Sequence, residues 1–269
     1  MAIVINVANF KGGVGKTTTV CLLGYSLADL GYKTLVVDMD PQANATEMLT
    51  RTYNIDRVEK TLYQAMQQKD LSYCLMELGK NLHLIPAELD LVGFPMLLNE
   101  MAGEDTYKRA YFLDFLLTSI KDDYDFIIID VPPTISDYTN NAVVASDYVL
   151  IVMQTHERSL AAAEKLIPYL EGMNENYNAN VSLLGVVPVL MKNDGTVDNY
   201  IIEESKKSFG KNLLNTTIFI RERIKRWDVH GITSEDIHDW RSLNMYHKLT
   251  KEILERLGFR EEERVVNNG

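Results

Sequence analysis

Apolar residues along the chain alternate between short, nearly continuous runs and stripes with helical spacing. The runs 2–7, 126–129 and 148–153 have the length and composition of strands buried on both faces. Segments 19–28 and 159–173 carry apolar residues three and four positions apart, as the buried side of a helix does. Because strands that alternate with helices form a mostly parallel sheet, the pattern predicts an α/β fold with a doubly wound sheet flanked by helices.

The expected elements cover most of the chain. We expect strands at 2–7, 32–38, 82–86, 124–130, 148–153, 181–190 and around 213–220. We expect helices at 19–28, 56–80, 88–101, 107–120, 140–145, 159–173, 197–209, 222–229 and 235–257. No stretch rich in Pro, Gly and Ser interrupts this series, so residues 1–269 are predicted to form a single domain.

A glycine-rich segment at 9–18 lies between the first expected strand and the first expected helix. Glycines at such a junction let backbone N–H groups turn inward, and the start of the helix adds partial positive charge. Lys16 supplies a full charge for the β- and γ-phosphates of a nucleotide, and Thr17 supplies a hydroxyl as a direct ligand for Mg²⁺. The segment therefore predicts a site for a nucleoside triphosphate and Mg²⁺.

The segment departs from the usual P-loop pattern, because Phe10 occupies the position of its first glycine and Lys11 follows. The run Lys-Gly-Gly-Val-Gly-Lys-Thr-Thr resembles the deviant Walker A sequence of the ParA/MinD family of ATPases. The resemblance implies a P-loop NTPase fold of the deviant Walker A type, and ATP binding by Gly12, Gly13, Val14, Gly15, Lys16, Thr17 and Thr18. It also implies that Lys11 reaches the partner's ATP in an ATP-dependent homodimer, where Lys11 and Lys16 serve catalysis.

Three aspartates follow apolar strands and complete the expected site. Asp130 fits a Walker B carboxylate that holds Mg²⁺ through water, and Asp38 is expected to contact Thr17 and the metal shell. A lone aspartate at the end of a strand is more often a helix cap, so these assignments depend on the three motifs occurring together. In the resembling family, the residue matching Asp40 positions or activates the water that attacks ATP.

The resemblance extends through segments 84–91, 125–134 and 154–160, and covers roughly residues 1–230. The last of these segments matches a variant found in plasmid ParA-type proteins of Gram-positive bacteria. Members of the family differ in what they position: DNA, a division inhibitor at the membrane, or an iron–sulfur cluster held between subunits. The remaining sequence is therefore needed to choose among these.

Net charge alone argues against a nucleic-acid partner, since it is −11 at pH 7. A local cationic run nevertheless occurs at 220–227. On a helix, Arg221 and Lys225 are four positions apart, and Arg223 and Arg226 are three apart, which gives a broad cationic face. Such a run is usually a solvated helix face. Here it matches the region through which ParA proteins contact DNA, and we therefore predict non-specific double-stranded DNA binding by these residues.

Two alternatives receive less support from the sequence. A MinD-like membrane-positioning ATPase would need a basic amphipathic tail, whereas the tail at 257–269 contains three consecutive glutamates. A cluster carrier would need well-placed cysteines, but Cys21 and Cys74 lie among apolar neighbours and are expected to be reduced core residues. No apolar run reaches the length of a membrane span, and we expect no membrane partner.

Together these features predict a cytoplasmic, nucleoid-associated DNA-partition ATPase. The resemblance implies that a ParB-like centromere-binding partner stimulates hydrolysis and thereby releases the dimer from DNA. It matches the small type of ParA that lacks an N-terminal helix-turn-helix. A protein that rides the nucleoid but positions a protein cluster fits the same sequence, so the cargo remains open.

Overall fold

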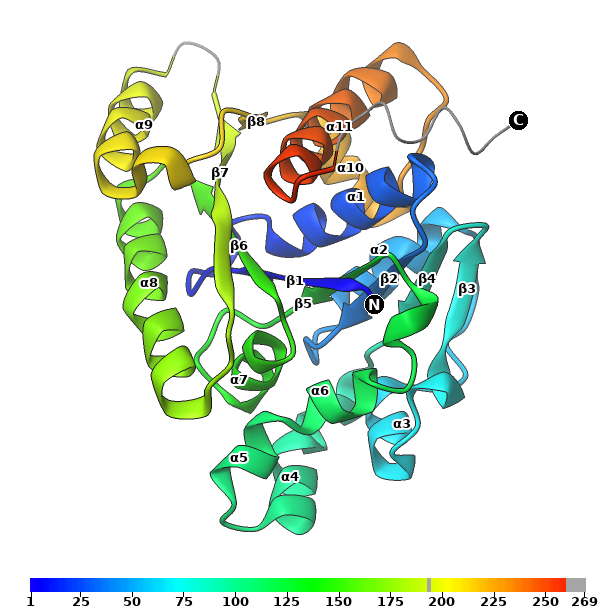
Figure 1. The fold of residues 1–269 in the computed structure, drawn as a ribbon. Helices are drawn as coiled ribbons and strands as arrows, with labels where there is room; N and C mark the ends of the chain where they lie inside the picture. Colours follow the sequence, from blue (N-terminus) through cyan, green and yellow to red (C-terminus); the bar gives the residue numbers. More distant parts are fainter. Residues whose placement is uncertain (193–194, 260–269) are drawn as a thin grey trace.

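The computed structural model describes residues 1–192 and 195–259, and its strands form one sheet (Figure 1). The strand order is β3-β4-β2-β5-β1-β6-β7-β8, and within the described residues only β3 and β4 pair antiparallel. The strands are β1 Ile3–Ala8, β2 Thr34–Asp38, β3 Met76–Gly79, β4 Leu82–Ile85, β5 Phe126–Asp130, β6 Tyr148–Gln154, β7 Ser182–Met191 and β8 Ile218–Phe219. The predicted doubly wound, mostly parallel sheet is confirmed.

Helices cover both faces of the sheet. The α-helices are α1 Lys16–Asp29, α2 Asn44–Thr52, α3 Leu62–Gln68, α4 Phe94–Ala102, α5 Thr106–Ala110, α6 Phe112–Leu117, α7 Asp137–Val144, α8 Glu157–Tyr177, α9 Thr196–Phe209, α10 Glu222–His230 and α11 Ile237–Arg256. Short 3-10 segments are η1 Leu71–Cys74, η2 Leu89–Gly93, η3 Lys121–Asp123 and η4 Gly210–Asn212. Helices α1, α2, α10 and α11 share one core with the sheet, whereas α3, α4, α6 and α7 share the core on the other face. Figure 1 shows α1 and α11 on one side of β1 and α7 on the other.

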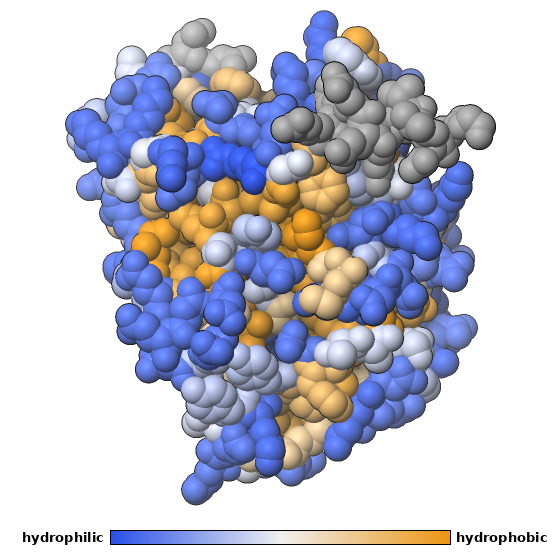
Figure 2. Space-filling model, viewed as in Figure 1, coloured by the Kyte–Doolittle hydropathy of each residue, from blue (hydrophilic) through white to orange (hydrophobic). Residues whose placement is uncertain are grey.

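The central strand β1 explains why its sequence is almost continuously apolar. Ile5 and Val7 point into the core that contains α1, and Val4 points into the core on the opposite face. All three side chains are fully buried. Burial of such a side chain contributes about 1.5–3 kcal/mol, so both layers of helices gain from the same strand. In Figure 2, hydrophilic residues cover the rim of the visible face and apolar ones gather near its centre.

Segment 56–80 differs from its prediction as one helix. Helix α3 ends at Gln68, η1 follows, and Met76–Gly79 forms β3 at the edge of the sheet, antiparallel to β4. The expected apolar stripe is nevertheless buried, and consists of Leu62, Ala65, Met66 and Leu71. The prediction was wrong for 76–79 because alternation over so few residues cannot be distinguished from one turn of a helix.

Two further differences concern segments 44–52 and 213–220. Helix α2 was not predicted; it begins just after Ala43, whose φ of 56° turns the chain sharply. The strand expected around 213–220 is reduced to Ile218–Phe219 and a single bridge between Leu213 and Val186. Both segments border the region where the predicted site residues gather.

The sheet brings the carboxyl ends of its central strands together. Asp38 at the end of β2 is in register with Asp130 at the end of β5, and Asp130 is also in register with Val7 of β1. The glycine-rich loop leaves β1 at this same edge and leads into α1. In open α/β sheets, ligands bind in the crevice at this edge, so the fold places the predicted site where a ligand is expected.

Candidate nucleotide-binding site

The loop between β1 and α1 has the backbone geometry of a phosphate cradle. Gly13 and Gly15 have φ values of 70° and 86°, in the left-handed region that glycine adopts without strain. Gly15 is the N-cap of α1, and no side chain of the described residues caps this helix start. The first turn begins with Lys16 and contains no acidic residue. The positive end of the α1 dipole is therefore presented to an anion.

A cavity of about 610 Å³ lies against this loop. Its walls include these predicted site residues: Gly12, Gly13, Gly15, Lys16, Thr17, Thr18 and Asp40. The Val14 side chain is fully buried in the core, so only the Val14 backbone is available to a ligand. The volume is typical of a site for a small organic ligand.

The two loop lysines have different surroundings. Lys16 is only 6% exposed, and burial lowers its pKa, although Asp130 and Asp40 oppose that change. Its Nζ lies 3.5 Å from the carbonyl oxygen of Lys11. Lys11 is half-buried and its Nζ donates a hydrogen bond to Oε1 of Gln154, at 3.0 Å. Lys16 therefore faces the cavity of its own chain, whereas Lys11 points toward the end of β6.

Asp38 is fully buried and its carboxylate is well satisfied by its own neighbours. Oδ2 accepts hydrogen bonds from the backbone N–H and the hydroxyl of Thr46, at 2.9 and 2.8 Å, and Oδ1 accepts one from the Asp40 N–H at 3.1 Å. Burial raises the pKa of Asp38, although these hydrogen bonds oppose the increase. The expected hydrogen bond from Thr17 is replaced by those from Thr46, because α2 places Thr46 beside the end of β2.

Asp130 is equally buried but lacks such partners. Neither carboxylate oxygen receives a hydrogen bond of ordinary geometry from the described residues. Burial and the neighbouring charge of Asp38 raise the pKa of Asp130 well above its usual value, and the nearby Thr17 hydroxyl only partly offsets this. Burying an unpaired carboxylate is costly, so this position suits a group that receives water or cation partners when a ligand is bound.

Asp40 lies near Asp38 and Asp130 and forms part of the wall of the cavity. Its Oδ1 accepts a hydrogen bond from the Gln42 N–H at 3.0 Å, and the residue is 8% exposed. Among the described residues, no three His, Cys, Asp or Glu side chains converge into a metal site of their own. A divalent cation here would therefore need ligands from the nucleotide and from water in addition to Thr17.

Helix α10 closes another side of the same cavity. The Thr18 hydroxyl donates to Oδ1 of Asp228 at 3.3 Å, and Nη1 of Arg51 donates to the Asp228 carbonyl oxygen at 2.9 Å. The first contact holds α10 beside the start of α1, and the second joins α10 to α2. Two residues predicted to bind DNA, Arg221 and Lys225, consequently line the cavity next to the glycine-rich loop.

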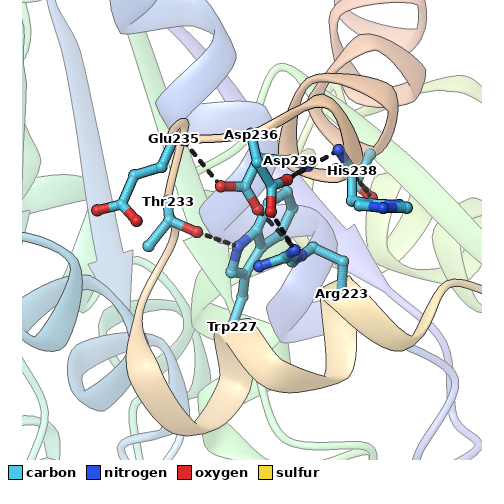
Figure 3. Close-up of polar contacts among 8 residues, drawn as sticks. Arg223, Trp227, Thr233, Glu235, Asp236, His238 and Asp239 are labelled. Carbon is cyan, nitrogen blue, oxygen red and sulfur yellow. Dashed lines mark hydrogen bonds and ion pairs between the residues drawn. The ribbon is translucent and has the colours of Figure 1, made fainter.

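Arg223 points toward Asp236 and Asp239 at the start of α11, as Figure 3 shows. Its Nη2 lies 2.5 Å from Oδ2 of Asp236, and its Nε lies 3.1 Å from Oδ1 of Asp239, a residue only 1% exposed. The ion pairs join α10 to the start of α11, and Trp227 is buried beneath them with its indole N–H donating to Thr233 at 3.0 Å. Arg223 therefore joins α10 to α11, and its contact with DNA stays a prediction.

The remaining cations of α10 are exposed. Lys225 forms a solvent-facing pair with Glu222 at 3.3 Å, and Arg226 is exposed. Arg226 lines a groove of about 380 Å³ together with Arg221, Glu222 and Arg223, and with His238 of α11. The structure thus brings part of the predicted cationic face together, on the outer side of the wall of the cavity.

The structure also bears on the two cysteines, on membrane-spanning helices and on two segments singled out in the sequence. Cys21 and Cys74 are both buried free thiols, and burial raises the pKa of each. No helix among residues 1–192 and 195–259 is long and apolar enough to cross a membrane. The glutamates of the tail at 261–263 and the loop residues Asn193 and Asp194 lie outside the described residues.

Sequence reasoning missed two residues that organise the site. Gln154 holds Lys11, and Thr46 holds Asp38 while also accepting a hydrogen bond from the Ala87 N–H at 2.9 Å. Neither belongs to the motifs that define the loop. The contact of Gln154 with Lys11 depends on β6 lying beside β1, and the contact of Thr46 with Asp38 depends on helix α2, which the sequence pattern did not predict.

Comparisons with known proteins agree with this geometry. A family model described as an AAA domain matches residues 2–183. The sporulation initiation inhibitor protein Soj of Bacillus subtilis is 33% identical, with 94% of this chain and 98% of that protein covered. The chromosome-partitioning ATPase Soj of Thermus thermophilus is 31% identical, with 94% and 96% covered.

A solved structure shares the fold over nearly the whole chain. The apo form of McdA from Cyanothece superposes with a TM-score of 0.80 at 23% identity, and the match covers 96% of this chain and 100% of that one. The likeness in sequence to the Soj proteins extends well beyond the glycine-rich loop. This chain belongs to the ParA/MinD family of P-loop ATPases.

Proposed function

We propose that residues 1–269 act as one ATPase domain that partitions DNA through an ATP-dependent cycle of dimerisation and DNA binding. The observation that carries this proposal is the shared wall of the nucleotide cavity. The glycine-rich loop and the cationic helix α10 meet there, joined by the hydrogen bond between Thr18 and Asp228. A change in the bound nucleotide can therefore alter the position of the helix that faces DNA.

For hydrolysis, we assign charge neutralisation to Lys16 and orientation of the attacking water to Asp40. Phosphoryl transfer needs little covalent chemistry from the protein, but it needs an in-line nucleophile and compensation of the developing negative charge. Lys16 is nearly buried and borders the cavity, so its charge acts at low dielectric. Asp40 borders the same cavity and carries a carboxylate that can accept a hydrogen bond from water.

The residues present also fit Mg²⁺. Thr17 would bind the ion directly, while Asp38 and Asp130 would hold it through water molecules. The unpartnered oxygens of Asp130 are the observation that supports this fit, since a buried carboxylate without donors suits ordered water around a cation. When bound, Mg²⁺ supplies neutralising charge to the β- and γ-phosphates.

Dimerisation is assigned to Lys11. In the single chain, its ammonium group contacts Gln154 at the end of β6 and does not line the cavity. A lysine in this position is available to the triphosphate of a second copy, and one contact of that kind makes dimerisation depend on ATP. The proposed dimer doubles the cationic surface, so that DNA affinity follows the nucleotide state.

The proposed DNA surface consists of Lys225 and Arg226, with Arg221 and His238 bordering the groove beside them. Arg223 supports this surface through its ion pairs with α11. Because such contacts reach phosphates and not base edges, binding should be independent of DNA sequence and sensitive to salt. A ParB-like centromere-binding partner completes the proposed cycle by stimulating hydrolysis in a cytoplasmic, nucleoid-associated protein.

Equilibrium DNA binding tests this function. The protein is titrated with duplex DNA of random sequence in the presence of ATP, ADP or no nucleotide, across a salt series. We expect tight binding with ATP alone, a steep fall with rising salt, and weaker binding by Arg226→Ala. Lys206→Ala on α9 serves as the control, because Lys206 is also an exposed helix cation but lies outside α10.

The DNA titration, together with liposome flotation, separates the proposed DNA-partition ATPase from its main alternative, a membrane-positioning ATPase. Binding to DNA that ignores the nucleotide would contradict the proposed switch. Co-flotation with anionic liposomes in ATP, without DNA binding, would instead support a membrane-positioning ATPase.

A further inference from the structure

The helical segment formed by η2 and α4 presents apolar side chains to solvent along one side. Leu89, Val92 and Met96 are 69%, 59% and 68% exposed. We propose that these three residues, called here the η2–α4 face, dock a cationic amphipathic helix of the partner that stimulates ATP hydrolysis. This inference rests on the proposed function, because it assigns a surface to the stimulating partner of the proposed ATPase.

The spacing of the three residues favours a helix as the occupant. Leu89 and Val92 are three positions apart, and Val92 and Met96 are four apart. On consecutive helical turns this spacing forms one narrow stripe, like the stripe along which two helices pack in a coiled coil. The opposite side of the segment is already covered, since Leu91 and Phe94 are fully buried in the core. A helix that is apolar on two sides is normally covered on both, so the η2–α4 face lacks a partner in the single chain.

The segment that carries this face is strongly acidic. Residues 88–105 contain no lysine, arginine or histidine, and their carboxylates are Glu88, Asp90, Glu100, Glu104 and Asp105. Among the described residues, the exposed side chains of Glu88, Glu100 and Glu104 form no ion pair. Their charge is available to a cationic partner, whereas the same face of a second copy, or an anionic bilayer, would be repelled. Charge complementarity therefore selects a cationic helix.

Hydrogen bonds connect the η2–α4 face to the nucleotide site. Just before η2, the Ala87 N–H donates to Oγ1 of Thr46 at 2.9 Å, and Thr46 donates two hydrogen bonds to the Asp38 carboxylate. Within η2, the Leu91 carbonyl oxygen accepts a hydrogen bond from the Tyr138 hydroxyl of α7 at 2.8 Å. A partner that displaces η2 would therefore displace groups at the end of β2 and at the start of α7.

The start of α7 is also joined to α4, through Arg109. Its Nη2 lies 2.8 Å from Oδ2 of Asp137, the first residue of α7, and its Nη1 donates to Oδ1 of Asn99 in α4. The loop 131–136 leads from β5 into α7, and two of its residues line the nucleotide cavity, Val131 and Pro133. Docking on α4 is thus transmitted to the cavity through α7, and this connection assigns the face to the stimulating partner.

Binding of a fluorescent synthetic peptide tests the docking surface. The probe is a helical peptide of about 20 residues, with leucines three and four positions apart and lysines on its other positions. Without nucleotide, it should bind the parent less tightly as salt rises, and a peptide with glutamate in place of lysine should not bind. Val92→Ser combined with Met96→Ser should weaken binding about tenfold or more. Val197→Ser combined with Tyr200→Ser is the matched control, because it removes two exposed apolar side chains of α9.

Phosphate release in the presence of ATP tests whether the face serves the stimulating partner. The lysine peptide should accelerate hydrolysis by the parent several-fold. It should not accelerate hydrolysis by the Val92→Ser, Met96→Ser variant, whose rate without peptide should equal that of the parent. Tyr138→Phe, which removes the hydrogen bond to Leu91, should bind the peptide like the parent and be stimulated less.

Each part of the proposal has a result that would overturn it. Equal peptide binding by the parent and by the Val92→Ser, Met96→Ser variant, or equal binding of the lysine and glutamate peptides, would overturn the docking surface. Binding to the parent without faster hydrolysis would overturn its assignment to the stimulating partner. A parent that does not hydrolyse ATP would contradict the proposed ATPase, whereas peptide binding without nucleotide would still decide the docking surface.

Discussion

Asp38 and Asp130 occupy the same register position at the carboxyl ends of the neighbouring strands β2 and β5. Both are fully buried, yet their hydrogen bonding is unequal: Asp38 accepts three hydrogen bonds, whereas the oxygens of Asp130 accept none of ordinary geometry from the described residues. Burial raises the pKa of both carboxyl groups, and the neighbouring charge of Asp38 raises the pKa of Asp130 further. The pair is therefore a local source of instability in the nucleotide-free protein.

Asp130→Asn should stabilise the nucleotide-free protein and abolish ATP hydrolysis. Because the pKa of Asp130 is higher in the folded state than in the unfolded state, ionisation at neutral pH disfavours folding. The asparagine should raise the unfolding midpoint by about 2–4 °C at pH 7. The gain should be absent below the unfolded pKa of about 3.9 and should grow as pH rises toward the folded pKa. Calorimetry across this pH range and phosphate release measure both effects.

Asp38→Asn is the matched control for that prediction. Its carboxylate receives three hydrogen bonds, two of them from Thr46, and one N–H group of an asparagine would face one of these donors. This variant should lose stability at pH 7. Equal changes in the two variants would show that hydrogen bonding does not distinguish them.

Lys11→Ala should abolish ATP-dependent dimerisation while the monomer keeps its affinity for ATP within a few-fold. Lys11 does not line the cavity of its own chain, so its removal leaves the residues around that cavity in place. Sedimentation velocity with ATP and with ADP measures the dimer. Gln154→Ala removes only the partner of Lys11 within the chain and should still dimerise. A Lys11→Ala protein that dimerises normally would exclude the contact in trans.

The sequence predicted those parts of the site that depend on contiguous motifs. The glycine-rich loop, Asp38 and Asp130 lie where the alternation of strands and helices places them, because each follows directly from a buried strand. Contacts between distant segments were not predictable in this way. Helix spacing suggested that Arg223 faces solvent, but its partners Asp236 and Asp239 follow a turn whose direction no local pattern indicates.

Arg223→Met should destabilise the fold by about 3–5 kcal/mol, because it leaves the buried carboxylate of Asp239 without its counter-ion. Urea unfolding measures this loss. Adding Asp239→Asn to the variant should recover part of it, since the uncompensated charge is then removed. Arg226→Met, which removes an exposed arginine of the same helix, should change stability by less than about 0.5 kcal/mol. A loss as small in Arg223→Met would contradict the structural role of this arginine.

Asp40→Asn should slow hydrolysis by about 10²–10⁴-fold and leave ATP binding intact. The asparagine oxygen can still accept the hydrogen bond from the Gln42 N–H, so the loop should keep its conformation. What is lost is the negative charge that orients and activates water. Phosphate release under single-turnover conditions measures the rate, and co-sedimentation with DNA measures how long the ATP-bound dimer persists.

Gln42→Ala is the matched control for Asp40, because Gln42 also lines the cavity but contacts Asp40 only through its backbone N–H. This variant should hydrolyse ATP at nearly the parental rate. Asp40→Asn should remain on DNA after the parent has dissociated, since only hydrolysis separates the proposed dimer. Parental hydrolysis by Asp40→Asn would remove Asp40 from the mechanism. Slow hydrolysis with unchanged release from DNA would instead show that release does not depend on hydrolysis.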